Sequence, residues 1–340
     1  MNNDVRLARL RGAKAAHRLH ATMETRARLG NTRGRVDVFN TLDELDVVVM
    51  FRPLDGLLGA YLRGTPPGVL ITTKRQHSIQ RFTAAHELGH AVLSHQPSLD
   101  SPDVLRRAAV GQTGPGPAGF ASLLQEIEAD AFAGEFLLPS WLIGNQAKAQ
   151  GWSRTHLSQP DTIYQLALRC GASYEATVRS LERNQVLARE SAVSALKTAP
   201  KALKKDVKLE ADWADPWSDA WIVTEADRGV ELCVVAGDLL GIRLKQAAGG
   251  GYLWRDIQYS ESLVRLDDST RLEGDGIGGE SERTFVYRAD GVGNASVRLE
   301  QKRPWESHGV EADFVFDVAN RGDGLSPQSR LKLVRSGLAR

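Results

Sequence analysis

Two histidines and a glutamate at residues 86–90 are the side chains best suited to chemistry in this chain of 340 residues. They form the motif His86-Glu87-Leu88-Gly89-His90 within RFTAAHELGH. Apolar residues recur around the motif at helical spacing without a proline, which predicts an amphipathic helix. Because residues four apart share a helix face, the imidazoles of His86 and His90 can bind one metal ion. Glu87 would then lie beside the ion, where a carboxylate can take a proton from a metal-activated water.

A third ligand separates a catalytic metal site from a chance HExxH match on an ordinary core helix. One known arrangement places a third His ten residues after the first, but that position is Gln96 here. His95 is one residue out of register. We interpret His95 as a helix-end residue, since His, Lys and Arg favour the last turn.

A second predicted helix at residues 125–139 offers carboxylates for the third position. Its apolar stripe and its proline stop are Ala129, Phe132, Ala133, Phe136, Leu137 and Pro139. Glu126 and Asp130 are four residues apart on one face, whereas Glu128 points elsewhere. We therefore expect Glu126 to bind the metal and Asp130 to accept the far N–H of a ligating His. The alternative is that all three carboxylates are solvated charges on a surface helix.

The two motifs together resemble those of the ImmA/IrrE family of zinc metallo-endopeptidases. HELGH follows QRFTAA, and the second helix reads E-x-x-A-D-x-F-A-x-x-F-L-x-P. The resemblance covers residues 35–185 and implies zinc bound by His86, His90 and Glu126, with Glu87 as general base. It also implies a gluzincin-like domain that cleaves a helix-turn-helix (HTH) repressor. Manganese or another divalent ion would fit the same donors, because a motif constrains ligands better than it constrains the ion.

Composition narrows the remaining classes of function. The 43 Lys and Arg nearly balance the 42 Asp and Glu, which argues against a general attraction to nucleic acid or membranes. Cys170 and Cys233 lie far apart in the sequence, so no disulfide framework is indicated. The N-terminus has no apolar signal core and no run approaches a membrane span. We expect a soluble protein of the cytoplasm.

The first 145 residues divide into two parts. Residues 1–35 are basic and predict a helix, with an apolar face and a polar, positive face. Its apolar face comprises Leu7, Leu10, Ala15, Leu19 and Met23. Residues 36–145 form the expected peptidase domain, with a short helix at 36–45 and a small mixed sheet. Its strands are predicted at 47–51, 59–62 and 68–72. The Pro- and Gly-rich residues 97–120 are either a lid or an ordinary insertion.

Residues 146–196 are interpreted as an HTH-like helical segment. Residues 162–181 read as helix, Gly171 and helix in HTH register. The second of these helices offers only Arg179 against Glu175, a poor match to a phosphate-rich groove. We therefore favour a structural or substrate-docking helix pair over a DNA reader. The Lys-rich residues 197–212 are expected to be a linker.

The periodicity changes from helical to alternating in residues 213–320. Short predicted strands fall at 221–224, 230–236, 239–244, 285–289, 295–300 and 314–318. This spacing predicts an all-β, antiparallel, immunoglobulin-like sandwich without helices. With the preceding domain, the fold class is α+β. Residues 321–340 are expected to be a loosely held tail.

Three loop segments of the predicted sandwich follow one another at a distinctive separation. They are residues 247–254 with Gly251, Tyr252 and Trp254, residues 276–279 with Gly276, Gly278 and Gly279, and the tripeptide Arg303-Pro304-Trp305. They resemble the loops by which chagasin-like inhibitors enter the cleft of papain-like cysteine proteases, a resemblance that covers residues 215–320. In the first loop only Gly251 and Tyr252 match the family pattern Asn-Pro-Thr-Thr-Gly-Tyr. A glycine-rich loop costs more to order on binding, which argues against tight inhibition.

The sequence therefore predicts a zinc endopeptidase followed by a chagasin-like protein-binding domain. Its expected partners are a protein substrate such as an HTH repressor, and either a papain-like cysteine protease or the chain's own peptidase cleft. The alternative is a non-catalytic interaction protein whose working part is the inhibitor-like sandwich.

Overall fold

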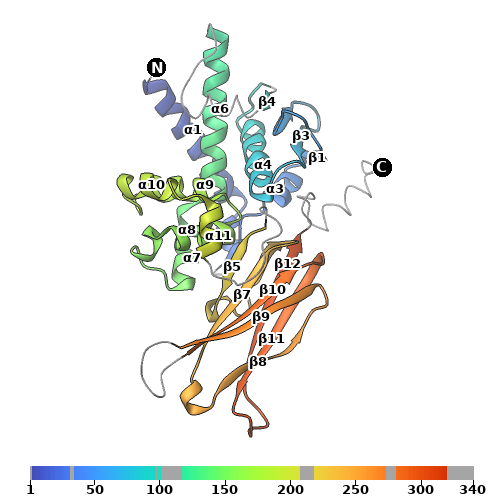
Figure 1. Cartoon of the computed structure of the whole chain (residues 1–340). Helices are drawn as coiled ribbons and strands as arrows, with labels where there is room; N and C mark the ends of the chain where they lie inside the picture. The colour runs from blue at the N-terminus through green and yellow to red at the C-terminus, as the bar shows by residue number, and fades with distance from the viewer. Residues whose placement is uncertain are drawn as a thin grey trace.

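We describe residues 2–30, 34–96, 98–100, 117–206, 218–272 and 281–319 of a computed structural model. A helical part with a small sheet occupies one end of the molecule, and a β-sandwich occupies the other (Figure 1). The expected α+β fold class is confirmed. Among the described residues, no helix has the length and apolar character needed to cross a membrane.

The N-terminal part packs helices around a small mixed sheet. Its helices are α1 (Asn2–Thr22), α2 (Thr25–Leu29), α3 (Val38–Glu44), α4 (His77–Val92) and α6 (Pro117–Leu137). Its strands are β1 (Val48–Arg52), β2 (Gly59–Leu62), β3 (Gly68–Thr72) and β4 (Ser98–Asp100), in the order β1-β3-β2-β4. β1 pairs parallel with β3, whereas β2 pairs antiparallel with both β3 and β4. The sheet is therefore mixed, as predicted, and α4 packs against β2 and β3.

α1 lies along α6 (Figure 1), and the predicted apolar face is buried in the second half of the helix, at Ala15 and Leu19, but not in the first half. Leu7 and Leu10 are 47% and 44% exposed, whereas Ala8 and Ala16 are buried. The two helices approach closely at Gly12, where a Cβ atom would lie 2.0 Å from the carbonyl oxygen of Glu128. Small residues let two helix backbones approach, so they and not the leucines define the buried face in this half of α1.

A compact group of helices follows. It comprises α7 (Ser140–Gln150), the 3₁₀ turn η1 (His156–Ser158), α8 (Pro160–Cys170), α9 (Tyr174–Arg183), α10 (Arg189–Leu196) and α11 (Pro200–Asp206). α8 and α9 are the helix pair predicted around Gly171, which takes φ +64° at the end of α8. α11 falls inside the expected linker. That expectation is wrong for residues 200–206, because Leu203 is buried and α11 packs on α8.

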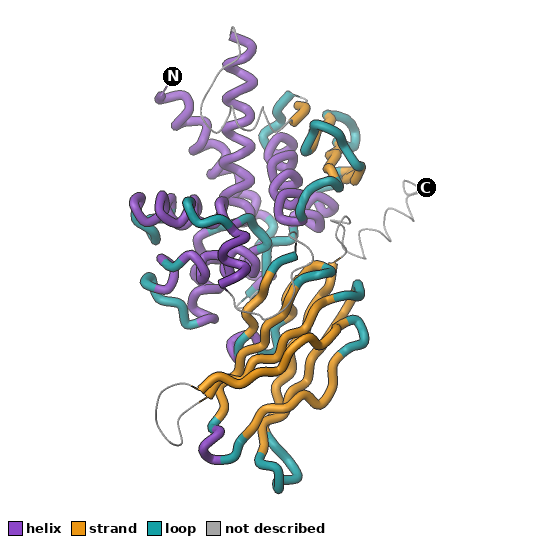
Figure 2. The backbone as a smooth tube through the Cα atoms, in the orientation of Figure 1, coloured by secondary structure: helices purple, strands orange, loops and turns teal. Residues whose placement is uncertain are grey.

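Two four-stranded sheets form the sandwich (Figure 2). Their strands are β5 (Ala220–Val223), β6 (Glu231–Val235), β7 (Leu239–Gln246), β8 (Leu253–Tyr259), β9 (Leu263–Leu272), β10 (Ser281–Ala289), β11 (Gly293–Lys302) and β12 (Val310–Ala319). The orders are β5-β7-β10-β9 and β6-β12-β11-β8, with 3₁₀ turns η2 (Glu225–Asp227) and η3 (Ala248–Gly250) between strands. The antiparallel prediction is wrong at two edges, where β5 pairs parallel with β7 and β6 pairs parallel with β12. Alternating patterns indicate faces but not strand direction.

Candidate metal centre

Helices α4 and α6 carry the candidate metal site. Gly89 of α4 faces α6, where an added Cβ atom would lie 3.1 Å from Phe132 Cδ1 and 3.2 Å from Ala129 Cα. The glycine therefore lets the two helices approach closely, one residue before His90. The apolar stripe predicted for the second helix is buried along its length.

The structure brings the three predicted ligands together. His86 Nε2 lies 3.0 Å from His90 Nε2 and 3.2 Å from Glu126 Oε2. His90 Nε2 lies 3.7 Å from Glu126 Oε1. One donor atom of each residue falls within 4.8 Å of the others, and all three residues are buried. Two imidazoles and a carboxylate are the donors that zinc takes in catalytic sites, so this group of side chains fits a metal ion.

Asp130 contacts the opposite nitrogen of His86. Its Oδ1 lies 2.9 Å from His86 Nδ1, which leaves Nε2 for the converging group. A hydrogen bond from Nδ1–H to a carboxylate fixes the tautomer and the ring orientation of a ligating His. Asp130 therefore lies beside the nitrogen expected for it, and its role as acceptor stays a prediction.

His95 and Glu128 lie beside the opposite nitrogen of His90, and sequence reasoning did not predict these contacts. His95 Nδ1 lies 2.9 Å from His90 Nδ1, and His95 Nε2 lies 3.0 Å from Glu128 Oε2. The chain turns back after α4 because Ser94 takes φ 56°, and the His95 N–H then donates to the His90 carbonyl at 3.0 Å. His95 therefore follows the end of α4, as expected, but its side chain is buried beside His90.

Glu87 is fully buried between α4 and β2. At Gly59 of β2 an added Cβ atom would lie 2.5 Å from Glu87 Oε1 and 2.4 Å from Thr83 Cγ2. Only glycine leaves room for the Glu87 carboxylate at this point of the strand. The strand therefore sets the position of the expected general base.

Burial and neighbouring imidazoles set the charges of this group. Burial raises the pKa of Glu126, but the hydrogen bonds and charges of His86 and His90 outweigh it and hold the pKa well below its usual range. Burial lowers the pKa of His95 against the opposing effect of Glu128. An ionised carboxylate is the state of Glu126 that binds a cation.

A second surface lies on the sandwich, where two of the predicted loops meet. The Arg303 guanidinium lies 4.4 Å from the Tyr252 ring centre and 5.9 Å from that of Trp305. Arg303 Nε also donates to the Gly250 carbonyl at 2.8 Å. Trp305 is 74% exposed, and Gly251 takes φ +78° beneath it. These contacts stiffen the glycine-rich loop, and we call residues 247–252 with 303–305 the tip.

Two further loop predictions have different outcomes. Trp254 is wrong as a loop contact, because it belongs to β8, is 1% exposed and donates from Nε1 to the Lys245 carbonyl at 2.8 Å. Its indole is part of the sandwich core. Gly276, Gly278 and Gly279 lie outside the described residues. Pro304 occupies the exposed turn after β11.

Comparison with known proteins shows that two segments of this chain match protein families. Residues 42–182 match the family described as the IrrE N-terminal-like domain (Peptidase_M78), and residues 233–319 match the chagasin family of peptidase inhibitors (I42). The chain joins an IrrE-like domain to a chagasin-like domain. The first match makes the N-terminal part a metallopeptidase-like domain. No curated protein matches the chain in sequence.

Solved structures similar to the chagasin-like domain include three proteins. The cysteine protease inhibitor EhICP2 from Entamoeba histolytica is 22% identical, with 31% of this chain and 100% of that chain covered and a TM-score of 0.28. Amebosin is 17% identical, with 30% and 98% covered and a TM-score of 0.25. PbICP-C, solved in complex with falcipain-2, is 15% identical, with 30% and 90% covered and a TM-score of 0.21.

The tip of the chagasin-like domain points away from the IrrE-like domain. Figure 2 shows η3 as the short helical turn at the end of the sandwich farthest from the helices. The opposite end, with the start of β5, contacts α8: Gln165 Nε2 donates to the Ala220 carbonyl at 2.8 Å. In this arrangement the tip does not cover the chain's own peptidase cleft, which was one of the alternative partners expected for the loops.

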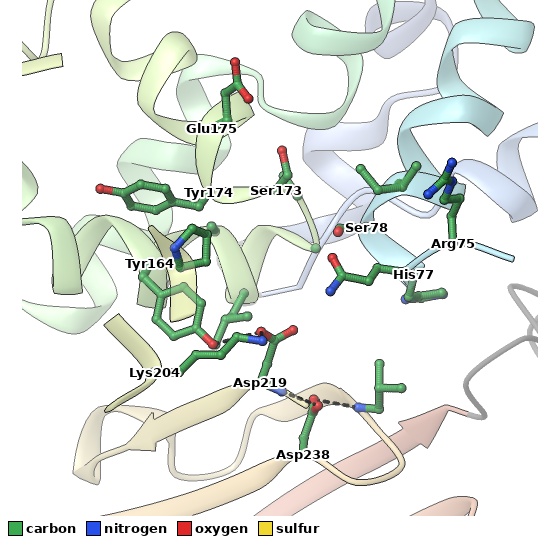
Figure 3. Close-up of a pocket in the computed structure, with 18 of the residues that line it drawn as sticks. Arg75, His77, Ser78, Tyr164, Ser173, Tyr174, Glu175, Lys204, Asp219 and Asp238 are labelled. Carbon is green, nitrogen blue, oxygen red and sulfur yellow. Dashed lines mark hydrogen bonds and ion pairs between the residues drawn. The ribbon is translucent and has the colours of Figure 1, made fainter. Parts of the chain in front are cut away.

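A cleft of about 910 Å³ separates the two domains at the N-terminal end of α4 (Figure 3). His77 and Ser78 line one side, and Asp238 lines the sandwich side. Lys204 and Tyr164 both contact Asp219 across the seam, at 2.9 Å each. Nine residues of helix separate His77 from His86, about 14 Å at 1.5 Å per residue, so this cleft is not the metal centre.

Proposed function

We propose that the IrrE-like domain is a metal-dependent endopeptidase, with zinc as the preferred ion. His86, His90 and Glu126 would be the ligands and Glu87 the general base. The observation that supports this proposal is the convergence of three buried donor atoms within 4.8 Å, one residue from a buried carboxylate.

The chain's own residues would divide the chemistry among themselves. A bound ion would supply Lewis acidity toward the attacking water and the scissile carbonyl. Glu87 would take the proton of the water and later deliver it to the leaving amine. Asp130 would keep His86 in the tautomer that leaves Nε2 unprotonated. Burial of the donors keeps bulk water from competing for these charges.

We propose a protein substrate, and an HTH-type repressor is the first candidate. This choice follows from the resemblance of HELGH and the second motif to ImmA/IrrE peptidases. The balanced charge of the chain fits a protein substrate better than a nucleic acid. We also propose that the domain acts in the cytoplasm.

Metal content tests the site directly. The Glu87→Gln chain should retain zinc at the wild-type stoichiometry, because Glu87 is not a ligand, yet its cleavage rate should fall by about 10² to 10⁴. The Glu126→Ala chain should lose both zinc and cleavage. Metal analysis of the purified chains, with cleavage assays on the same samples, checks both statements. Full proteolysis by folded Glu87→Gln protein would exclude the mechanism.

The tip favours a second function, inhibition of a papain-like cysteine protease. Trp305 is exposed and supported by Arg303, and the tip faces away from the rest of the chain. The solved relatives include inhibitors of cysteine proteases by their own descriptions. Titration of papain with the full Glu87→Gln chain tests this function. Inhibition should weaken in the Trp305→Ala chain, and absence of inhibition at micromolar chain would remove this function.

A further inference from the structure

We propose that His95 and Glu128 are positioning residues that hold His90 in the orientation and tautomer that metal binding requires. The inference rests on the proposed function, because it concerns the same metal site. It adds a second carboxylate-supported ligand to the one that Asp130 supports. Neither residue belongs to the HExxH motif or to the expected ligand set.

The first step concerns the two nitrogens of His90. Nε2 is the atom that converges with His86 Nε2 and Glu126, at 3.0 Å and 3.7 Å. Nδ1 faces His95 Nδ1 at 2.9 Å. A His that ligates through Nε2 must carry its proton on Nδ1 and needs an acceptor there. His95 Nδ1 lies where that acceptor is needed.

The second step concerns the proton of His95. If Nδ1 of His95 accepts from His90, a neutral His95 must carry its proton on Nε2. Glu128 Oε2 lies 3.0 Å from that nitrogen and can accept it. The hydrogen bonds therefore run in one direction, from His90 to His95 to Glu128. The opposite direction would put the His90 proton on Nε2 and abolish its lone pair toward the metal.

The third step is the rigidity of this arrangement. The side chains of His95 and Glu128 are 6% and 11% exposed, so solvent does not compete for their hydrogen bonds. α1 packs against α6 beside Glu128, since an added Cβ atom at Gly12 would lie 2.0 Å from the Glu128 carbonyl oxygen. Arg11 of α1 also lies 3.4 Å from Glu128 Oε1. α1 thus contacts the Glu128 carboxylate, which in turn contacts His95.

His20 serves as a control for His95, because it is a buried histidine outside the candidate metal site. His20 is also buried, stacks on Phe136 and contacts the Phe136 carbonyl at 3.0 Å. It belongs to the same helix pair, α1 and α6, yet it contacts none of the three expected ligands. Loss of His20 should therefore cost stability without changing the metal site.

The test measures zinc dissociation constants by chelator competition on the full chain. We expect His95→Leu to weaken zinc binding about ten- to a hundredfold, the range found when outer-shell partners of ligands are removed. His95→Asn should recover most of the affinity, since its Oδ1 can accept near the position of Nδ1. Glu128→Ala should have a smaller effect in the same direction. His20→Leu should leave the affinity unchanged.

The tautomers supply a readout independent of activity. Long-range ¹H–¹⁵N correlation of the zinc-loaded chain should show the His90 proton on Nδ1 and the His95 proton on Nε2. The reverse tautomer of His95, or a His95→Leu chain with wild-type zinc affinity, would overturn the inference and leave the peptidase proposal standing. Failure of the wild-type chain to bind zinc at all would overturn both.

Discussion

At the scale of single residues, the candidate metal site depends on two glycines whose missing side chains leave space for neighbouring groups. Glu87 can lie against β2 only because position 59 has no side chain, and Gly89 has the same role between α4 and α6. Neither glycine takes a positive φ, so their requirement is space and not backbone conformation. A methyl group at Gly59 would contact Glu87, and one at Gly89 would contact Phe132 of α6.

Gly59→Ala should therefore displace the Glu87 carboxylate. We expect the cleavage rate to fall by about 100-fold, the cost of a misplacement near 1 Å, while zinc affinity stays near the wild-type value. Gly68→Ala in β3 is the control, because its Cβ atom would have ordinary contacts at 3.8 Å. Parallel measurements of cleavage and zinc binding check the split, and equal activity of the two variants would contradict it.

His20 predicts the sign of one pH dependence. Burial lowers its pKa, against the opposing hydrogen bond to Phe136. Below about pH 6.5 the unfolded chain binds a proton at this position that the folded chain does not, so stability is lost as the pH falls. His20→Gln removes this titration. Its Tm should fall less than that of the wild type between pH 7.5 and 5.5, and equal slopes would exclude a contribution from His20.

At the scale of elements, the candidate metal centre depends on the packing of three helices. α6 lies between α1 and α4 (Figure 1). A displacement of α1 would therefore move α6, which carries Glu126. At Gly12 the packing leaves no room for a side chain.

Gly12→Val should push α1 away from α6. We expect a loss of at least about 1–3 kcal/mol in the free energy of unfolding, the usual cost of overpacking. Gly144→Ala in α7 is the control, since nothing lies within 4 Å of its Cβ position and Ala favours helix. Denaturant unfolding of both variants measures the difference. A Gly12→Val chain as stable as the control would show that α1 does not pack as described.

Sequence patterns predicted the bounds of helices and strands better than they predicted which residues contact one another in the fold. β2 and β3 have the predicted bounds, and the three candidate ligands that converge in the structure follow from spacing on two helices. His95 could not be placed in this way, because its contact with His90 depends on the left-handed turn at Ser94. The exposure of Leu7 likewise depends on where α6 lies.

At the scale of the whole molecule, buried polar contacts join the two domains. Arg169 of α8 and Asp227 of η2 form an ion pair at 2.9 Å, with both side chains 1% exposed. Arg169 also donates to the Ile222 carbonyl at 2.7 Å, and Gln150 donates to Asp227 at 2.5 Å. Such a network fixes the direction of the tip relative to the IrrE-like domain.

Arg169→Ala would leave the Asp227 charge buried without its main partner. We expect this variant to lose about 3–5 kcal/mol in stability, the usual result of breaking one side of a buried pair. Arg179→Ala removes the exposed Arg179–Glu175 pair and should cost at most about 1 kcal/mol. Thermal unfolding of both chains compares the two pairs. Similar losses of stability in the two variants would show that the Arg169–Asp227 pair is not buried between the domains.

The central claim is that the IrrE-like domain cleaves a protein with Glu87 as base. The most direct test compares newly formed protein N-termini in cells that express the wild-type chain or the Glu87→Gln chain at equal levels. The account predicts new termini in one or a few proteins, an HTH-type repressor among them, only with the wild-type chain. The same new termini in both cells would contradict the role of Glu87, and a lack of new termini with the zinc-loaded wild-type chain would contradict the peptidase itself.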